Sequence, residues 1–256
     1  MDRDGRRRYG GSKPGVQSSC GHVDAQIDSK AMRSAAVSGR DRDRELVRLV
    51  GRHGVLTVEQ AMRAASVGRT ATYRRVAALI EAGLLERLDL LRSQPSLLHA
   101  TRDGLRYAGL GMPVAKVSPG SVDHWLRCAT VALDLGERYG HDRVLTEREI
   151  IAKEALEDRS LAKARLDSGG AVQRFHRADL AILTDEGVIA VEVELTAKAS
   201  RRLEALIRAW RREVGRGGVS EVRYLCEPGQ TLRLVERVVR KVQAGGFIQV
   251  EEAPAP

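Results

Sequence analysis

Three acidic residues stand out in the stretch RADLAILTDEGVIAVEVELTAK, which spans residues 177–198. Glu192 and Glu194 lie two apart in an otherwise apolar segment, and side chains two apart on a strand point to the same face. Asp179 begins a second apolar segment, which precedes the first across the polar turn TDEG. Like carboxylates held side by side repel each other unless a cation lies between them. The pattern therefore predicts an acidic cluster that binds a divalent metal ion.

The turn fixes which residues of the two segments face each other. A hairpin with Thr184 to Gly187 as its loop pairs Leu183 with Val188, Ala181 with Ala190, Asp179 with Glu192, and Arg177 with Glu194. Cβ atoms of directly opposed residues are about 4.5–5.5 Å apart. Asp179 and Glu192 are therefore the predicted ligands of the metal, which would be Mg²⁺ or Mn²⁺.

A purely structural role for the carboxylates is the alternative. In that case Arg177 pairs with Glu194, and one of three basic residues neutralises Glu192: Lys198, Arg201 or Arg202. Charged faces are common on exposed strands, so the spacing of two acidic residues does not by itself decide between these hypotheses.

The elements around these residues predict an α/β domain over residues 122–253. VDHWLRCATVALDLGERYG has the period of an amphipathic helix, and RVLTEREI fits a strand or the start of a helix. Residues 153–176 are polar and predict a loop. The two strands of the hairpin follow, and then a helix in ASRRLEALIRAWRREVG, a strand in EVRYLC, a helix in TLRLVERVVRKVQAG and a strand in FIQVEEA. This order predicts an α/β sandwich around one mixed sheet.

Residues 43–111 predict a winged helix-turn-helix. Three helical patterns occur in DRELVRLVGRHG, TVEQAMRAA and RTATYRRVAALIEAG, and two short strand patterns follow in LLERLDLL and SLLHAT. Thr57 and Gln60 predict a capping box at the second helix. Gly83 predicts the end of the third. In such a domain the third helix enters the DNA major groove. The predicted DNA contacts are Arg69, Thr70, Thr72, Tyr73, Arg74 and Arg75, with Arg92 at the hairpin tip.

The basic charge is concentrated in the first 111 residues. The net charge of the whole chain is +9, and Lys and Arg exceed Asp and Glu by 4 in residues 1–42, by 4 in residues 43–111 and by 1 in the remainder. A basic half beside a balanced half favours double-stranded DNA as a partner, although some winged helices bind only protein. Residues 1–42 predict a disordered basic arm, and the Pro- and Gly-rich segment 112–121 predicts a linker.

The remaining composition indicates a cytoplasmic protein. Cys20, Cys128 and Cys226 are far apart and form no CxxC motif, and the six histidines lack ligand-like spacing. We therefore expect neither a disulfide framework nor a zinc site. No apolar run approaches 18 residues, so we expect no membrane span.

Asp179, Glu192-Val193-Glu194 and Lys198, set among helix, hairpin, helix and strand, resemble the PD-(D/E)XK nuclease superfamily with its restriction-endonuclease-like core. This resemblance implies that the aspartate and glutamate hold Mg²⁺ and that the lysine orients or activates the attacking water. From about Arg44 to Val250 the chain also resembles the replication-relaxation family of plasmids and mobile elements, through EAGLLER, TEREI, ADLAIL and VEVELTAK. That family implies a winged helix joined to a nuclease-like domain, acting with replication or mobilisation proteins.

Two positions depart from the nuclease pattern. Ala178 stands where a proline would precede the aspartate, and Glu194 stands at the position of the lysine, so that Lys198 would have to reach back in its place. Glu147, in TEREI, is a further candidate ligand. The implied catalytic set is Asp179, Glu192, Glu194 and Lys198, and Arg201, Arg202, Arg208, Arg211 and Arg212 are candidate phosphate contacts.

Three functions agree with these features. The first is a DNA-binding protein that acts in replication, relaxation or mobilisation without cutting. The second is a metal-dependent DNA endonuclease or nickase. The third is a winged-helix transcriptional regulator whose second domain dimerises or senses a ligand in an apolar pocket.

Overall fold

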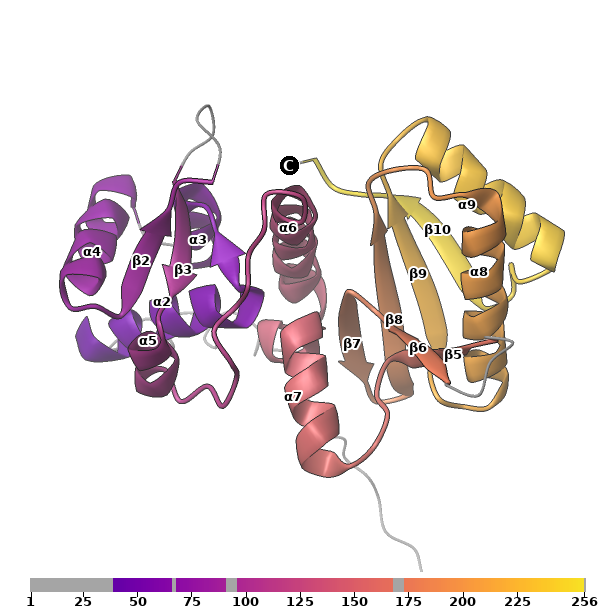
Figure 1. Cartoon of the computed structure of the whole chain (residues 1–256), viewed down its shortest axis with the longest axis horizontal. Helices are drawn as coiled ribbons and strands as arrows, with labels where there is room; N and C mark the ends of the chain where they lie inside the picture. Colours follow the sequence, from indigo (N-terminus) through magenta and orange to yellow (C-terminus); the bar gives the residue numbers. More distant parts are fainter. Residues whose placement is uncertain (1–38, 66–67, 91–95, 168–172, 256) are drawn as a thin grey trace, which may run out of the picture. The chain divides into compact units, whose positions relative to one another are not determined.

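The computed structural model describes residues 39–65, 68–90, 96–167 and 173–255 (Figure 1). Most of the predicted basic arm lies outside these residues, and so does Arg92. Gly39–Pro256 makes one unit by its internal contacts. None of the helices in the described ranges has the length and apolar character that crossing a membrane requires.

Helices and a small antiparallel sheet form the first part of this unit. In chain order the elements are α2 (Gly39–His53), β1 (Val55–Leu56), α3 (Val58–Ala65), α4 (Arg69–Glu81), β2 (Leu85–Leu88), β3 (Leu97–Ala100) and α5 (Arg102–Tyr107). The sheet has the strand order β1-β3-β2, and both pairings are antiparallel. The three predicted helices and the predicted strand pair therefore all form.

Local signals set the ends of these helices. The predicted capping box is confirmed: the Thr57 amide donates to Gln60 Oε1 at 3.0 Å, and the Gln60 amide donates to Thr57 Oγ1 at 3.1 Å. Gly83 follows α4 with φ of 68°, which a side chain would disfavour. The apolar faces of α2 and α4, with Val47 and Val76 fully buried, pack around the sheet.

A five-stranded mixed sheet organises the second part of the chain. Its elements are α6 (Val122–Tyr139), the 3₁₀ turn η1 (His141–Arg143), β4 (Val144–Thr146), α7 (Glu147–Glu157), β5 (Lys163–Leu166), β6 (Arg174–Arg177), β7 (Leu180–Thr184), β8 (Gly187–Glu194), α8 (Ser200–Gly215), β9 (Glu221–Cys226), α9 (Gln230–Val242) and β10 (Ile248–Glu252). The strand order is β10-β9-β8-β7-β4. Strands β8, β9 and β10 are parallel, and β7 and β4 are antiparallel to their neighbours. The predicted mixed sheet is thus confirmed.

Helices cover both faces of this sheet, as Figure 1 shows. Ala190 and Tyr224 face a core that includes Ile207 and Trp210 of α8 and Val235 of α9. On the opposite face, alternate residues of β7 and β8 pack against Val131, Ala132 and Leu135 of α6. The alternation of side chains along β8 therefore directs Glu192 toward the α8 side and its neighbours toward α6.

The predicted hairpin register is confirmed for the residues of β7 and β8 that pair with each other. Leu183 pairs with Val188 and Ala181 with Ala190, and the ladder ends at Leu180 and Val191. Asp179 is the next residue outward, so it lies at the end of the ladder, level with Glu192.

Two predictions for the segment before the hairpin are wrong. Residues 153–176 are not one loop, because α7 continues to Glu157 and the strands β5 and β6 form a separate two-stranded sheet. Arg177 does not face Glu194. It lies in β6 opposite Lys163, and its guanidinium donates to Glu154 at 2.9 Å.

Candidate functional site

Asp179 joins the end of the sheet to helix α6. Its Oδ2 accepts a hydrogen bond of 2.8 Å from the Val193 amide, so the carboxylate satisfies a strand amide beyond the last paired residue of β7. Its Oδ1 lies 2.9 Å from Nε2 of His124. Burial acts to lower the pKa of His124, but the larger effect of the Asp179 hydrogen bond raises it overall. Both carboxylate oxygens of Asp179 therefore have protein partners.

Glu192 is almost completely buried, with 1% of its surface exposed. Its Oε1 lies 2.7 Å from Nε2 of His176 and accepts a hydrogen bond of 2.9 Å from the Trp210 indole. Burial raises the pKa of Glu192, against the opposing effect of His176. Burial also acts to lower the pKa of His176, but the charge and hydrogen bond of Glu192 raise it overall. The side chain thus belongs to a buried polar pair closed by an aromatic ring.

Glu194 has its own cationic partner. Lys198 forms an ion pair and hydrogen bond with its Oε1, and only 3% of Glu194 is exposed. Burial raises the pKa of Glu194, while Lys198 acts in the opposite direction. Lys198 therefore reaches back toward the strand as the sequence suggested, but it binds Glu194 and not Glu192.

This pairing decides how well the donor set fits Mg²⁺ or Mn²⁺. Asp179, Glu192 and Glu194 each bind a different basic residue: His124, His176 and Lys198. Hard divalent cations need several oxygen ligands that face them freely, and they retain water. The carboxylates as arranged do not fit such an ion, since their charges are already balanced within the chain. Basic residues neutralise the carboxylates, but not in the predicted pairs, because Lys198 binds Glu194, His176 binds Glu192 and Arg177 binds Glu154.

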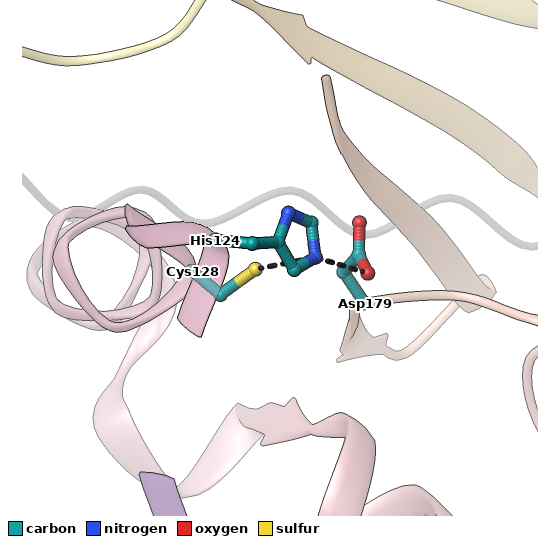
Figure 2. Close-up of side chains that lie close together, drawn as sticks. All are labelled: His124, Cys128 and Asp179. Atoms are coloured by element: carbon teal, nitrogen blue, oxygen red, sulfur yellow. Dashed lines mark hydrogen bonds and ion pairs between the residues drawn. The ribbon is translucent and has the colours of Figure 1, made fainter. Parts of the chain in front are cut away.

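Two residues beside Asp179 were not singled out from the sequence. His124 and Cys128 lie one turn apart on α6, and Cys128 Sγ is 3.4 Å from His124 Nε2 (Figure 2). Burial raises the pKa of the Cys128 thiol well above its usual value, and the charge of Asp179 adds to the rise. The spacing of His and Cys at i and i+4 was the available signal, since such residues share one helix face.

A small cavity of about 40 Å³ adjoins this group. His124, Cys128, Asp179 and Glu147 line it, together with residues from α2, β4 and α7: Arg52, His53, Thr146 and Arg148. Burial raises the pKa of Glu147, and Asp179 adds to that rise. Glu147 therefore shares this cavity with Asp179, and its role as a ligand stays a prediction.

The predicted DNA contacts on α4 divide into two sets. Arg69, Thr70 and Arg74 are exposed. Thr72 is buried, with its Oγ1 bonded to Gly68 O at 3.2 Å. The Arg75 guanidinium binds Asp43 at 2.7 Å, and the Tyr73 hydroxyl donates to Glu59 at 3.3 Å. Helix α4 thus has an exposed set of predicted contacts, Arg69, Thr70 and Arg74, and a second set whose side chains bind other residues of the protein.

The arginines of α8 also divide. Arg208 binds Glu204, Arg211 donates to the Val242 carbonyl at 2.8 Å, and Arg212 binds Asp167. Arg201 and Arg202 are exposed at the start of the helix. The predicted phosphate contacts that remain available are therefore those nearest Lys198.

No family model matches the chain, and no curated protein matches it either. Among solved structures, protein VC1899 from Vibrio cholerae matches with a TM-score of 0.31 and 11% sequence identity. The match covers 85% of this chain and 53% of that chain, so this chain spans about half the length of that protein. A TM-score this low does not establish a shared fold.

Proposed function

We propose that the protein binds double-stranded DNA through the exposed face of α4 and acts in replication, relaxation or mobilisation of DNA. The single observation that supports this most directly is that Arg69, Thr70 and Arg74 are exposed together on one helix. The inner residues Val76 and Leu79 hold the same helix in its core. A helix anchored on one face and basic on the other is suited to enter a major groove.

The elements around α4 support the same function. Helix α3 precedes it with a short break, and the β2–β3 pair follows it, which is the element order of a winged helix. The guanidinium of Arg69 lies over the ring of Tyr73, 5.7 Å from the ring centroid, which is within the roughly 6 Å limit of a cation–π contact. This contact restrains Arg69 on the helix surface, which lowers the entropy cost of a phosphate or base contact.

Duplex binding tests this proposal. We expect Arg69→Ala with Arg74→Ala to weaken binding to a fluorescently labelled mixed-sequence duplex by at least about tenfold, measured by anisotropy. The matched control is Arg237→Ala with Arg240→Ala on α9, which removes the same charge from two exposed positions. Equal loss of affinity in both double variants would show that net charge alone is responsible and would contradict the proposal.

Metal-dependent cleavage of DNA is the second candidate function. The observation in its favour is the hairpin register, which sets Asp179 level with Glu192 and two residues from the Lys198–Glu194 pair. For cleavage, the ion pairs of the carboxylates would first have to open, because the present pairing does not fit Mg²⁺ or Mn²⁺.

Supercoiled plasmid separates the two candidates. Cleavage predicts nicked or linear product with Mg²⁺ or Mn²⁺, no product with a chelator, and none from Asp179→Ala. The variant with Arg69→Ala and Arg74→Ala, which should bind DNA more weakly, should then also cut plasmid more slowly. If the plasmid stays supercoiled while it is fully bound by the protein, the cleavage function is excluded and DNA binding without hydrolysis is retained.

A further inference from the structure

Three chemically different ligand atoms converge at the N-terminal half of α6. His124, Cys128 and Asp179 each offer one atom, and these atoms all lie within 4.8 Å of one another. Figure 2 shows His124 between the other two, with its Nε2 2.9 Å from Asp179 Oδ1 and 3.4 Å from Cys128 Sγ. The same ring nitrogen thus meets both an oxygen and a sulfur.

Two of the three separations, those from His124 Nε2, are close to those around a tetrahedral cation, and the third, between Asp179 and Cys128, is within 4.8 Å. With bonds of about 2.0 Å to nitrogen and oxygen and about 2.3 Å to sulfur, neighbouring ligands of Zn²⁺ lie about 3.3 Å apart for N and O and about 3.5 Å apart for N and S. The observed separations of 2.9 Å and 3.4 Å differ from these by at most about 0.4 Å. A small side-chain movement would therefore make room for the ion.

The chemistry of the donors selects the class of cation. Thiolate and imidazole favour borderline and soft transition metals, whereas Mg²⁺ takes oxygen ligands. Asp179 is also well oriented, because its second oxygen accepts a hydrogen bond from the Val193 amide, as outer partners of metal ligands commonly do. Glu147 lines the same cavity. The fourth ligand would be either Glu147 or a water molecule in the cavity.

We propose that His124, Cys128 and Asp179 bind a divalent transition-metal cation of the Zn²⁺ class. On binding, the Cys128 thiol releases its proton to solvent, and the Nε2 proton that His124 shares with Asp179 leaves to solvent or shifts to Nδ1. The cation then replaces the hydrogen bond between His124 and Asp179 with two coordinate bonds. This proposal stands apart from DNA binding by α4. It replaces the hard-ion site expected from Asp179 and Glu192 with one that uses Asp179 and α6.

Cobalt is the probe that reports the sulfur ligand. The full chain, stripped with a chelator and then dialysed, is titrated with Co²⁺ under anaerobic conditions while its visible and near-ultraviolet spectrum is recorded. We expect one equivalent to bind with the visible bands of tetrahedral Co²⁺ and a thiolate-to-cobalt charge-transfer band. Zn²⁺ should displace it, and Mg²⁺ in large excess should not.

Variants assign the ligands. Cys128→Ser should abolish the charge-transfer band and weaken Co²⁺ binding at least about tenfold, while Cys226→Ala, which removes another buried thiol, should leave both unchanged. Asp179→Asn and His124→Asn should each weaken binding similarly, and they provide the test if Cys128→Ser fails to fold. The thermal midpoint of the wild type should rise with Zn²⁺, and that of the variants should not.

Two results would overturn the proposal. One is the absence of a stoichiometric Co²⁺ spectrum in protein that is folded by circular dichroism. The other is a spectrum or a Zn²⁺-induced stabilisation that persists in Cys128→Ser and Asp179→Asn. Either would mean that the three side chains form only a metal-free hydrogen-bonded group.

Discussion

Asp179, Glu192 and Glu194 are each bound by a different basic residue. Asp179 meets α6, Glu192 meets β6 and α8, and Glu194 meets Lys198 just before α8. A buried carboxylate without such a partner would be protonated or destabilising. The question raised by two glutamates on one strand face thus has a structural answer, in which separate partners balance each charge.

The segment predicted the acidic cluster but not its partners. Strand alternation and the polar turn were local signals, so the register that sets Asp179 level with Glu192 followed from the sequence. His176 comes from a strand whose position depends on the whole fold, so nothing local in the sequence pointed to it. For His124, the spacing to Cys128 was a local signal, but its pairing with Asp179 depends on the fold. Cys128 was not predicted as a ligand, because a single cysteine is a candidate ligand only when other ligands lie beside it. Asp179, which lies beside it in the fold, is 51 residues later in the chain.

His53 at the end of α2 gives the stability of the protein a dependence on pH. Burial, with a smaller contribution from Arg52, lowers its pKa to about 3. Since the unfolded side chain titrates at 6.5, unfolding takes up a proton below that pH, and stability falls between pH 6.5 and about 3. At pH 5 this loss is about 2 kcal/mol.

The variant His53→Gln removes this titration. We expect its free energy of unfolding, from urea titrations monitored by circular dichroism, to change less between pH 8 and pH 5 than that of the wild type. Its stability at pH 8 serves as the reference for any packing defect. The same pH dependence in both proteins would show that His53 is not held neutral in the folded state.

At the scale of elements, boundaries marked by caps and turns were predicted, and the strands β5 and β6 were not. Their side chains are mostly exposed or half-buried, as at Arg174 and Phe175, so they lack the apolar alternation that marks a strand. Their pairing with each other and the packing of β5 against α8 define them instead. Polar strands of this kind are recognised only once their neighbours are placed.

Thr146 links the start of α7 to α2. It accepts a hydrogen bond of 3.3 Å from the Glu149 amide in a capping box, and its hydroxyl also donates to the Arg52 carbonyl at 2.8 Å. Glu149 in turn binds the Arg52 guanidinium at 2.9 Å. This group therefore caps a helix and ties two elements together.

Removing the hydroxyl should destabilise the protein. We expect Thr146→Ala to lower the free energy of unfolding by about 1–2 kcal/mol, as for lost N-caps elsewhere. Thr146→Ser keeps the oxygen and should lose much less, so the pair isolates the hydroxyl in urea denaturation. A loss of equal size in both variants would assign the effect to the methyl group instead.

At the scale of the whole molecule, charge is unevenly divided along the chain. The basic surplus lies in the first 111 residues, where α4 presents its arginines, and the remainder is nearly balanced. Helix α6 begins at Val122, directly after the predicted linker 112–121. That segment is itself held, since the Pro113 carbonyl accepts from Arg148 at 2.6 Å and the Ala115 carbonyl lies 3.0 Å from His99 Nε2.

The salt dependence of duplex binding tests the central claim, that α4 meets the phosphates and bases of DNA. Each phosphate contact adds about 0.9 to the slope of log affinity against log salt concentration. We predict that Arg69→Ala with Arg74→Ala lowers this slope by about 1–2 relative to the wild type, whereas Arg237→Ala with Arg240→Ala leaves it unchanged. A wild-type slope in the α4 variant, with wild-type affinity, would contradict the account.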